Sequence, residues 1–300
     1  MQNNFRKLAL EKLASLTQIV EETLSAAPKE PVKFQTLGSA GPGATVLASN
    51  NAVQPDGGVD IVINLRGLPG VPKAVESLGI NAAVVTAEAV GPQSQNMGST
   101  LLEQQFGSAQ KINELVDKTI SYLQAQNPSK HVYRKRLIIS AFSGGGGPAG
   151  TIISQRNQIK GGLDGVIFND ALHTEIGSAK MKSIVDFAKE CLNDPRKTFK
   201  DLHTRIVPWS EKLGRYTSTT ETANHILNEL GMSEQTPTNI DPKFDFNPTA
   251  VAKKGGVEII SMYDKPAPYY VDNRAGSAGD QHIQALKKGH PYLFRDVLSS

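Results

Sequence analysis

The sequence predicts an α/β fold in which a mostly parallel sheet carries helices on both faces. Short apolar runs of strand length alternate along the chain with longer segments whose apolar residues recur at helical spacing. This alternation is typical of parallel strands that are joined by crossover helices. A glycine-rich turn also follows one of the apolar runs directly. That position is informative because ligands bind beyond the carboxyl ends of the strands in such sheets.

An amphipathic helix is expected at the start of the chain, within residues 1–27. Apolar residues from Phe5 to Leu24 recur at helical spacing, and charged residues take the other face. We expect this helix to pack on a single α/β domain that comprises residues 28–300. Strands are expected at 44–48, 59–65, 82–86, 136–141, 165–169, 202–207 and 257–262, and helices at 100–124, 149–155, 179–192, 219–230 and 291–298.

Residues 232–256 interrupt this alternation. They are polar, rich in Pro, Asp and Lys, and show little periodicity. We therefore expect an excursion over the surface or a small cap at this point, rather than a second domain.

The composition excludes several classes of protein. Hydrophobic residues make up 39% of the chain and charged residues 20%, which excludes a disordered protein. A net charge of +3 over 300 residues is not the basic footprint of a nucleic-acid-binding protein. The apolar runs are too short to cross a bilayer, and the single cysteine, Cys191, excludes a disulfide scaffold. The N-terminus lacks the features of a signal peptide, so a cytoplasmic location is expected, although a mature secreted form would look the same.

The sharpest local feature is the segment 136–150, in which an apolar strand runs into Ser143 and then into four glycines. Small residues on both sides of the serine, Ala141 and Gly145, fit a nucleophile elbow, where the serine sits on a tight strand-to-helix turn. Gly144 would offer its backbone N–H to an oxyanion. The helix behind the turn would add a favourable dipole for that negative charge.

Two other interpretations of this turn stay open. Gly145, Gly147 and Gly150 match the spacing of a dinucleotide fingerprint, with Asp170 about twenty residues further on. That interpretation predicts a nicotinamide- or flavin-dependent oxidoreductase, although the fingerprint normally lies in the first βα unit of its domain. Alternatively, the glycines only allow a tight turn and close packing. A phosphate-binding loop is disfavoured because no lysine follows the glycines at the required position.

A nucleophile elbow requires an acid and then a histidine later in the chain. His282 lies in a loop between the last predicted strand and the C-terminal helix, where an imidazole can reach the serine, and His290 is the fallback. Asp170 ends a predicted strand, where its carboxylate would be partly buried and able to hold an imidazolium. Asp264 ranks second as the acid and Glu221 third, since Glu221 also fits a helix capping box.

Further residues are candidates for contact with the substrate. The second oxyanion donor is expected in the loop after an early strand, at Gly67 or Leu68. Arg66, at the start of the same loop, is a candidate for binding an acidic group of the substrate. Tyr269 and Tyr270 are candidates for the walls of the substrate pocket.

Taken together, these residues resemble the α/β-hydrolase superfamily, including its poorly characterised bacterial members. The resemblance rests on residues 64–67 after an early strand, residues 141–145 at the elbow, Asp170 and His282, and it covers residues 40–298 in topology. It implies a carboxylesterase- or amidase-like serine hydrolase without metal or organic cofactor, acting on a small-molecule ester or amide. Ser143 would be the nucleophile, His282 the base and Asp170 the acid. Because Ala141 replaces the usual glycine, a non-catalytic binding protein with the same fold is a further alternative.

Overall fold

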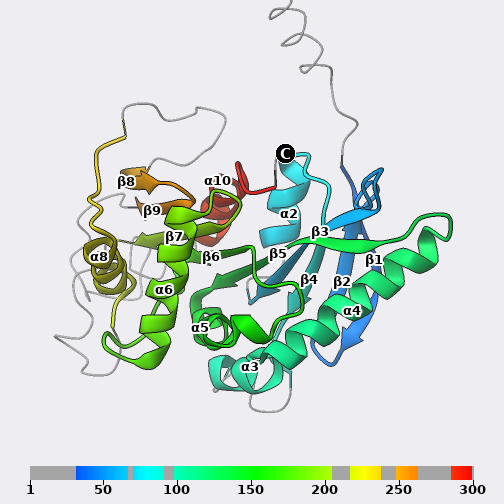
Figure 1. The fold of residues 1–300 in the computed structure, drawn as a ribbon, viewed down its shortest axis with the longest axis horizontal. Coiled ribbons are helices and arrows are strands. Elements are labelled where there is room, and N and C mark those ends of the chain that lie inside the picture. The colour runs from blue at the N-terminus through cyan, green and yellow to red at the C-terminus, as the bar shows by residue number, and fades with distance from the viewer. Residues whose placement is uncertain are drawn as a thin grey trace, which may run out of the picture.

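The described part of the chain folds around one central sheet (Figure 1). The computed structural model describes residues 32–66, 70–90, 98–204, 217–237, 248–262 and 285–298. Within these ranges the sheet has nine strands in the order β1-β2-β4-β3-β5-β6-β7-β9-β8. The strands are β1 (Phe34–Gly41), β2 (Ala44–Ser49), β3 (Gly58–Leu65), β4 (Ala83–Ala87), β5 (Tyr133–Phe142), β6 (Gly165–Asn169), β7 (Thr198–Thr204), β8 (Pro248–Lys254) and β9 (Val257–Met262).

The centre of the sheet is parallel and its outer strands are antiparallel. Strands β4, β3, β5, β6, β7 and β9 run parallel to one another, whereas β1, β2 and β8 pair antiparallel with their neighbours. Every residue of β3 is buried, because helices cover the central strands on both faces. The fold class predicted from the sequence is therefore confirmed.

Two apolar cores lie on the two faces of the sheet. The larger core joins Ile61 and Ile63 of β3 to residues of α3 (Gly98–Phe106), α4 (Ala109–Gln126), α5 (Gly146–Ser154), α6 (Ala179–Asn193) and α8 (Thr219–Leu230). The smaller core joins Val62 to α2 (Gly70–Ser77) and α10 (His290–Phe294). Neighbouring residues of a strand point to opposite faces, so β3 contributes to both cores. Figure 1 shows α4, α5 and α6 together on one side of the sheet.

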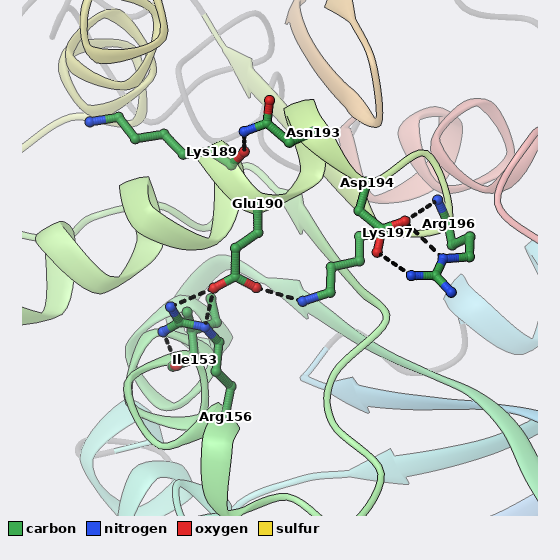
Figure 2. A network of polar contacts seen from close by, with 8 residues as sticks. All are labelled: Ile153, Arg156, Lys189, Glu190, Asn193, Asp194, Arg196 and Lys197. Atoms are coloured by element: carbon green, nitrogen blue, oxygen red, sulfur yellow. Dashed lines mark hydrogen bonds and ion pairs between the residues drawn. The ribbon is translucent and has the colours of Figure 1, made fainter.

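A partly buried ion network fixes α6 against the end of α5 (Figure 2). The Glu190 carboxylate accepts hydrogen bonds from Arg156 Nη2 (2.6 Å) and Lys197 Nζ (2.5 Å). Burial acts to raise the pKa of Glu190, but these hydrogen bonds leave it below its usual value. The ionised carboxylate therefore ties together the helix after the elbow, α6 and the approach to β7.

The structure divides the helix that was expected at 100–124. It shows α3 and α4 in its place, separated by Gly107 and Ser108. The Ser108 side chain accepts a hydrogen bond from the backbone N–H of Lys111 (3.2 Å), so a new helix begins at this cap. The single-helix prediction was wrong because the apolar spacing continues across the break.

Several strands also differ from the expectation. The strand expected at 202–207 is β7, which begins four residues earlier, at Thr198, and includes the buried charged residues Lys200 and Asp201. Strands β1 and β8 and helix α2 were not expected. Strand β8 lies within 232–256 and forms the edge of the main sheet, so that part of the segment is neither a cap nor a surface excursion. Strands β6 and β9 and helix α8 have the expected bounds. The expected helix within residues 1–27 lies outside the described residues.

No helix in the described ranges is long and apolar enough to span a membrane.

Candidate active site

Three strained residues mark the carboxyl edge of three neighbouring strands. Among the described residues, the non-glycine residues with a positive φ angle are only Arg66 (φ 65°), Ser143 (φ 52°) and Asp170 (φ 49°). They follow β3, β5 and β6 directly, and these strands are adjacent in the sheet. Side chains disfavour this backbone region, and such strain concentrates at functional sites. All three residues were predicted from the sequence to belong to the site.

Ser143 lies on a crowded turn that only glycines can complete. A Cβ atom on Gly145 would overlap the carbonyl oxygen of Leu65 at the end of β3. A Cβ on Gly146 would overlap the carbonyl oxygen of Ala171, just after β6. The elbow is thus wedged between the ends of the two strands that flank β5. The half-buried Ser143 is held at the point where β5 turns into the short 3₁₀ turn (Ser143–Gly145) and then α5.

The next residue, Gly144, lies under the side chain of Arg66. A Cβ on Gly144 would overlap the Arg66 guanidinium nitrogen Nη1 and would come within 3.1 Å of the Ser99 Cβ. Both Arg66 and Ser99 are exposed. The surroundings of the predicted oxyanion donor are therefore polar and open to solvent.

The remaining glycines of the turn serve protein packing, which does not favour the dinucleotide fingerprint. A Cβ on Gly147 would lie 3.2 Å from Glu103 Oε2, and a Cβ on Gly150 would press on Lys180. Burial acts to raise the pKa of Glu103, but hydrogen bonds from Thr151 and Lys180 leave it below the usual value. An ionised carboxylate at this place would repel a pyrophosphate.

Asp170 lies in a buried, hydrogen-bonded position directly after β6. The residue is 2% exposed. Its carboxylate accepts hydrogen bonds from the Thr204 backbone N–H (3.2 Å), the Thr204 hydroxyl (3.2 Å) and the Thr219 hydroxyl (2.7 Å). The Asp170 backbone N–H donates to Leu202 O (2.7 Å). These contacts from β7 and α8 fix the carboxylate in one orientation. Asp170 also lies beside the elbow, because the next residue, Ala171, touches Gly146.

Glu221 and His290 lie in places where they serve the structure of the protein, as a helix cap and as a buried ring. The Glu221 carboxylate accepts a hydrogen bond from the Ser218 backbone N–H (2.7 Å), and the Ser218 hydroxyl accepts one from the Glu221 N–H (3.1 Å). This is the capping box of α8. His290 is fully buried, with its ring centroid 6.4 Å from those of Phe142 and Phe294. A general base must exchange protons with substrate and water, so this burial disfavours His290 as the base.

Six predicted site residues lie outside the described ranges. They are Gly67, Leu68, Asp264, Tyr269, Tyr270 and His282.

A second group of polar residues, which the sequence analysis did not predict, lies at the ends of β7 and β9. The Ser261 hydroxyl is 3.0 Å from His203 Nε2, and Glu234 Oε1 is 3.2 Å from the same nitrogen. In a catalytic triad, the serine and the acid bind different nitrogens of the imidazole. His203 and Ser261 are also 0% exposed. This group, which we term the buried cluster, therefore lacks both the geometry and the access of an active site.

Asp201 lies beside the buried cluster in the interior. Its burial, together with the negative charges of Asp170 and Glu234, raises its pKa well above the usual value. The surroundings therefore favour the protonated, neutral form of this side chain. Spacing along the sequence did not reveal this group, because its members come together only through strand pairing and the segment after α8. No group of three or more His, Cys, Asp or Glu side chains in the described ranges is arranged to hold a metal ion.

Comparison with known proteins gives distant structural similarities. The chain matches no protein-family model and no curated protein. It is similar to an uncharacterised protein from Capnocytophaga ochracea, with 8% identity and a TM-score of 0.43, over 88% of this chain and 64% of that protein. It thus spans less than two thirds of that protein's length.

Two further examples of similar structures are named as an esterase and a dienelactone hydrolase. One is a cold-adapted esterase from an Arctic intertidal metagenomic library, with 9% identity, a TM-score of 0.42, and coverage of 91% of this chain and 97% of that one. The other is a dienelactone hydrolase from Anabaena variabilis, with 10% identity, a TM-score of 0.41, and coverage of 90% and 100%. Similarity at this level says nothing about activity, so the fold assignment rests on the chain's own strand order and elbow. That order, the parallel centre of the sheet and the strand–turn–helix at Ser143 give this chain the α/β-hydrolase fold.

Proposed function

We propose that the chain is a serine hydrolase that cleaves a small-molecule ester or amide through an acyl-enzyme intermediate. The observation that carries this proposal is the backbone of Ser143, which has a φ of 52° on a turn wedged between β3 and β6. Such strain requires support from its surroundings, and Gly145 and Gly146 provide the necessary space. A serine that was only a surface residue would not require this arrangement.

In the proposed mechanism, Ser143 Oγ attacks the carbonyl carbon of the substrate while His282 accepts its proton. The negative charge that develops on the carbonyl oxygen is stabilised by the backbone N–H of Gly144 and a second N–H at Gly67 or Leu68. His282 then donates the proton to the leaving group. A water molecule, deprotonated by His282, hydrolyses the acyl-enzyme and regenerates Ser143.

Asp170 is proposed to hold the imidazole of His282 and to stabilise its charged form. Its carboxylate is buried and fixed by Thr204 and Thr219, which is the kind of environment that role requires. Tyr269 and Tyr270 are proposed to contribute to the substrate pocket.

Hydrolysis of short-chain aryl esters tests the proposal. Wild-type protein should release the phenol with saturation kinetics, whereas Ser143→Ala should lose kcat/KM by on the order of 10⁴-fold or more. Ser154→Ala is the matched control, because it removes a hydroxyl from the last residue of α5. Full activity of Ser143→Ala, with Ser154→Ala unchanged, would remove Ser143 from the mechanism.

The acid is tested separately by three amide substitutions, Asp170→Asn, Asp264→Asn and Glu221→Gln. Removal of the triad acid lowers kcat by about 10⁴-fold in a well-studied case. We expect a loss of this kind for Asp170→Asn alone. A large loss for Asp264→Asn, with Asp170→Asn active, would transfer the role to Asp264.

A further inference from the structure

Arg66 occupies a strained position that points its side chain toward the elbow. It is the first residue beyond β3, and its backbone N–H donates to Ala87 O at the end of β4 (3.0 Å). Its φ of 65° lies in the left-handed region, which glycine would occupy without steric cost. An arginine in a conformation that suits glycine indicates that the side chain, and not the turn alone, matters at this position.

The Arg66 guanidinium lies directly over the residue that follows the nucleophile. Its Nη1 atom occupies the space that a Cβ on Gly144 would need, and its Cζ atom is 3.5 Å from that position. The backbone N–H of Gly144 is the proposed oxyanion donor, so the positive charge of Arg66 lies close to where the substrate carbonyl would bind.

Arg66 also differs from the other arginines of the described ranges in its partners. Each of those arginines lies within 4.0 Å of an acidic side chain: Arg134 near Asp164, Arg136 near Asp60, Arg156 near Glu190, Arg196 near Asp194 and Arg295 near Glu258. Figure 2 shows two of these pairs, Arg156 with Glu190 and Arg196 with Asp194. Within the described residues, Arg66 makes no ion pair or hydrogen bond through its side chain, and it is exposed.

We propose that Arg66 is a specificity-determining residue that binds a carboxylate of the substrate, so the preferred ester or amide carries a carboxylate near the scissile carbonyl. This inference rests on the proposed hydrolase function. The guanidinium presents a planar fork of donors that matches a carboxylate with two parallel hydrogen bonds. Its other possible role, as an additional donor to the oxyanion, would act on every substrate equally.

Two matched pairs of esters test the proposal and locate the carboxylate. On the acyl side, monomethyl glutarate is compared with methyl hexanoate. On the alcohol side, O-acetylglycolate is compared with propyl acetate. For each pair the readout is the ratio of kcat/KM for the charged ester to that for the neutral ester, in wild type, Arg66→Gln and Arg66→Lys. All three residues share the same backbone strain, so the variants differ mainly in charge and hydrogen-bonding geometry.

We expect the wild-type protein to prefer the charged ester in one of the two pairs. In Arg66→Gln that ratio should fall by about tenfold to a hundredfold, as for the loss of one hydrogen bond to a charged group. The ratio for Arg66→Lys should lie between that of wild type and that of Arg66→Gln. The pair that responds shows whether the carboxylate belongs to the acyl or the alcohol part.

Failure of this inference can be distinguished from failure of the proposed function. An unchanged ratio in both pairs, or equal losses for charged and neutral esters, would remove Arg66 from carboxylate recognition while hydrolysis persists. If no ester is hydrolysed, the proposed function fails instead. Protection of Ser143 from a fluorophosphonate reagent by monomethyl glutarate, compared with methyl hexanoate, then measures carboxylate binding independently of turnover. Equal protection by the charged and the neutral ester, or equal protection in wild type and Arg66→Gln, would contradict the inference.

Discussion

Two serines at the carboxyl edge of the sheet have opposite surroundings. Ser143 lies on a strained turn after β5, is half-buried, and makes no side-chain hydrogen bond to another described residue. Ser261, near the end of β9, lies 3.0 Å from His203 Nε2 and also contacts Glu234, but it is 0% exposed. By residue type alone, the buried cluster of Ser261, His203 and Glu234 is the more complete triad.

A serine, a histidine and an acid in contact are therefore not sufficient for a hydrolytic site. In the buried cluster, Ser261 and Glu234 contact the same nitrogen of His203, so the acid cannot hold the ring while the other nitrogen accepts a proton. No substrate can reach a fully buried hydroxyl. Ser143, by contrast, has a strained backbone, closely packed glycines and a nearby guanidinium, and it is partly open to solvent. These features favour a catalytic role for Ser143.

The largest expected effect separates the two serines directly. Ser143→Ala should abolish ester hydrolysis, whereas Ser261→Ala should keep kcat/KM close to wild type, because the reaction does not use the buried hydroxyl. Initial rates with an aryl ester, measured on folded samples of both variants, check this prediction. A comparable loss of activity in both variants, each with a wild-type melting temperature, would contradict the assignment of catalysis to Ser143 alone.

The second prediction concerns the space under the elbow. Gly146→Ala places a Cβ against the carbonyl oxygen of Ala171, which is backbone and cannot move aside cheaply. We expect a loss of about 2 kcal/mol or more in the free energy of unfolding, by urea denaturation. Gly147→Ala is the neighbouring control, because its Cβ would meet only the flexible end of Glu103. It should stay within about 1 kcal/mol of wild type. Equal losses at the two positions would contradict the wedged geometry.

The third prediction uses the pH dependence of Asp201, beside the buried cluster. Burial and the nearby charges of Asp170 and Glu234 raise its pKa in the folded protein. Ionisation therefore favours the unfolded chain, and this contribution lowers stability as pH rises above the ordinary aspartate pKa, until the folded-state pKa is reached. Asp201→Asn removes the contribution. Its free energy of unfolding relative to wild type should rise with pH from the ordinary aspartate pKa up to the folded-state pKa of Asp201, with a limiting slope of about 1.4 kcal/mol per pH unit.

Asp56 provides a control of opposite sign. The Gly58 backbone N–H and the Tyr133 hydroxyl hold the pKa of Asp56 below its usual value, so its contribution to stability is present near neutral pH and is lost as pH falls. Asp56→Asn should therefore become more destabilising as pH rises toward the ordinary aspartate pKa, and its effect should stay constant above about pH 4. A flat profile for Asp201→Asn above about pH 4 would mean that burial does not raise the pKa of Asp201.

The smallest expected effect concerns Glu221. Because its carboxylate closes the capping box of α8, Glu221→Ala should lower the free energy of unfolding by about 0.5–1 kcal/mol and leave the kinetics of hydrolysis unchanged. Thermal melting together with ester kinetics checks both parts. A selective loss of activity at wild-type stability would restore Glu221 as a candidate acid.

The sequence was most informative where the structural requirement is local. The run from β5 through Ser143 into glycines predicted the elbow, because a strand, a tight turn and a helix each leave a mark on neighbouring residues. Strand β6 was recognised from its apolar residues, and Asp170 was identified as the polar residue at its end. The fold class followed from the same alternation of strands and helices.

The parts that were missed depend on contacts between distant segments. Nothing in the sequence marks the positive φ of Arg66, and its position over Gly144 arises only when β3 and β5 pair. The start of β7 was missed because Lys200 and Asp201 look like surface residues, although Lys200 is paired with Glu258 (3.2 Å) in the interior. Strands β1 and β8 were missed because edge strands with exposed faces lack a continuous apolar run.

The most direct test of the central claim is to react the full-length protein with a fluorophosphonate reagent and to locate the adduct by peptide mapping. We predict one adduct, on Ser143, with no label in Ser143→Ala and none on Ser261. Labelling of a different serine, or failure of the folded protein to react at all, would contradict it.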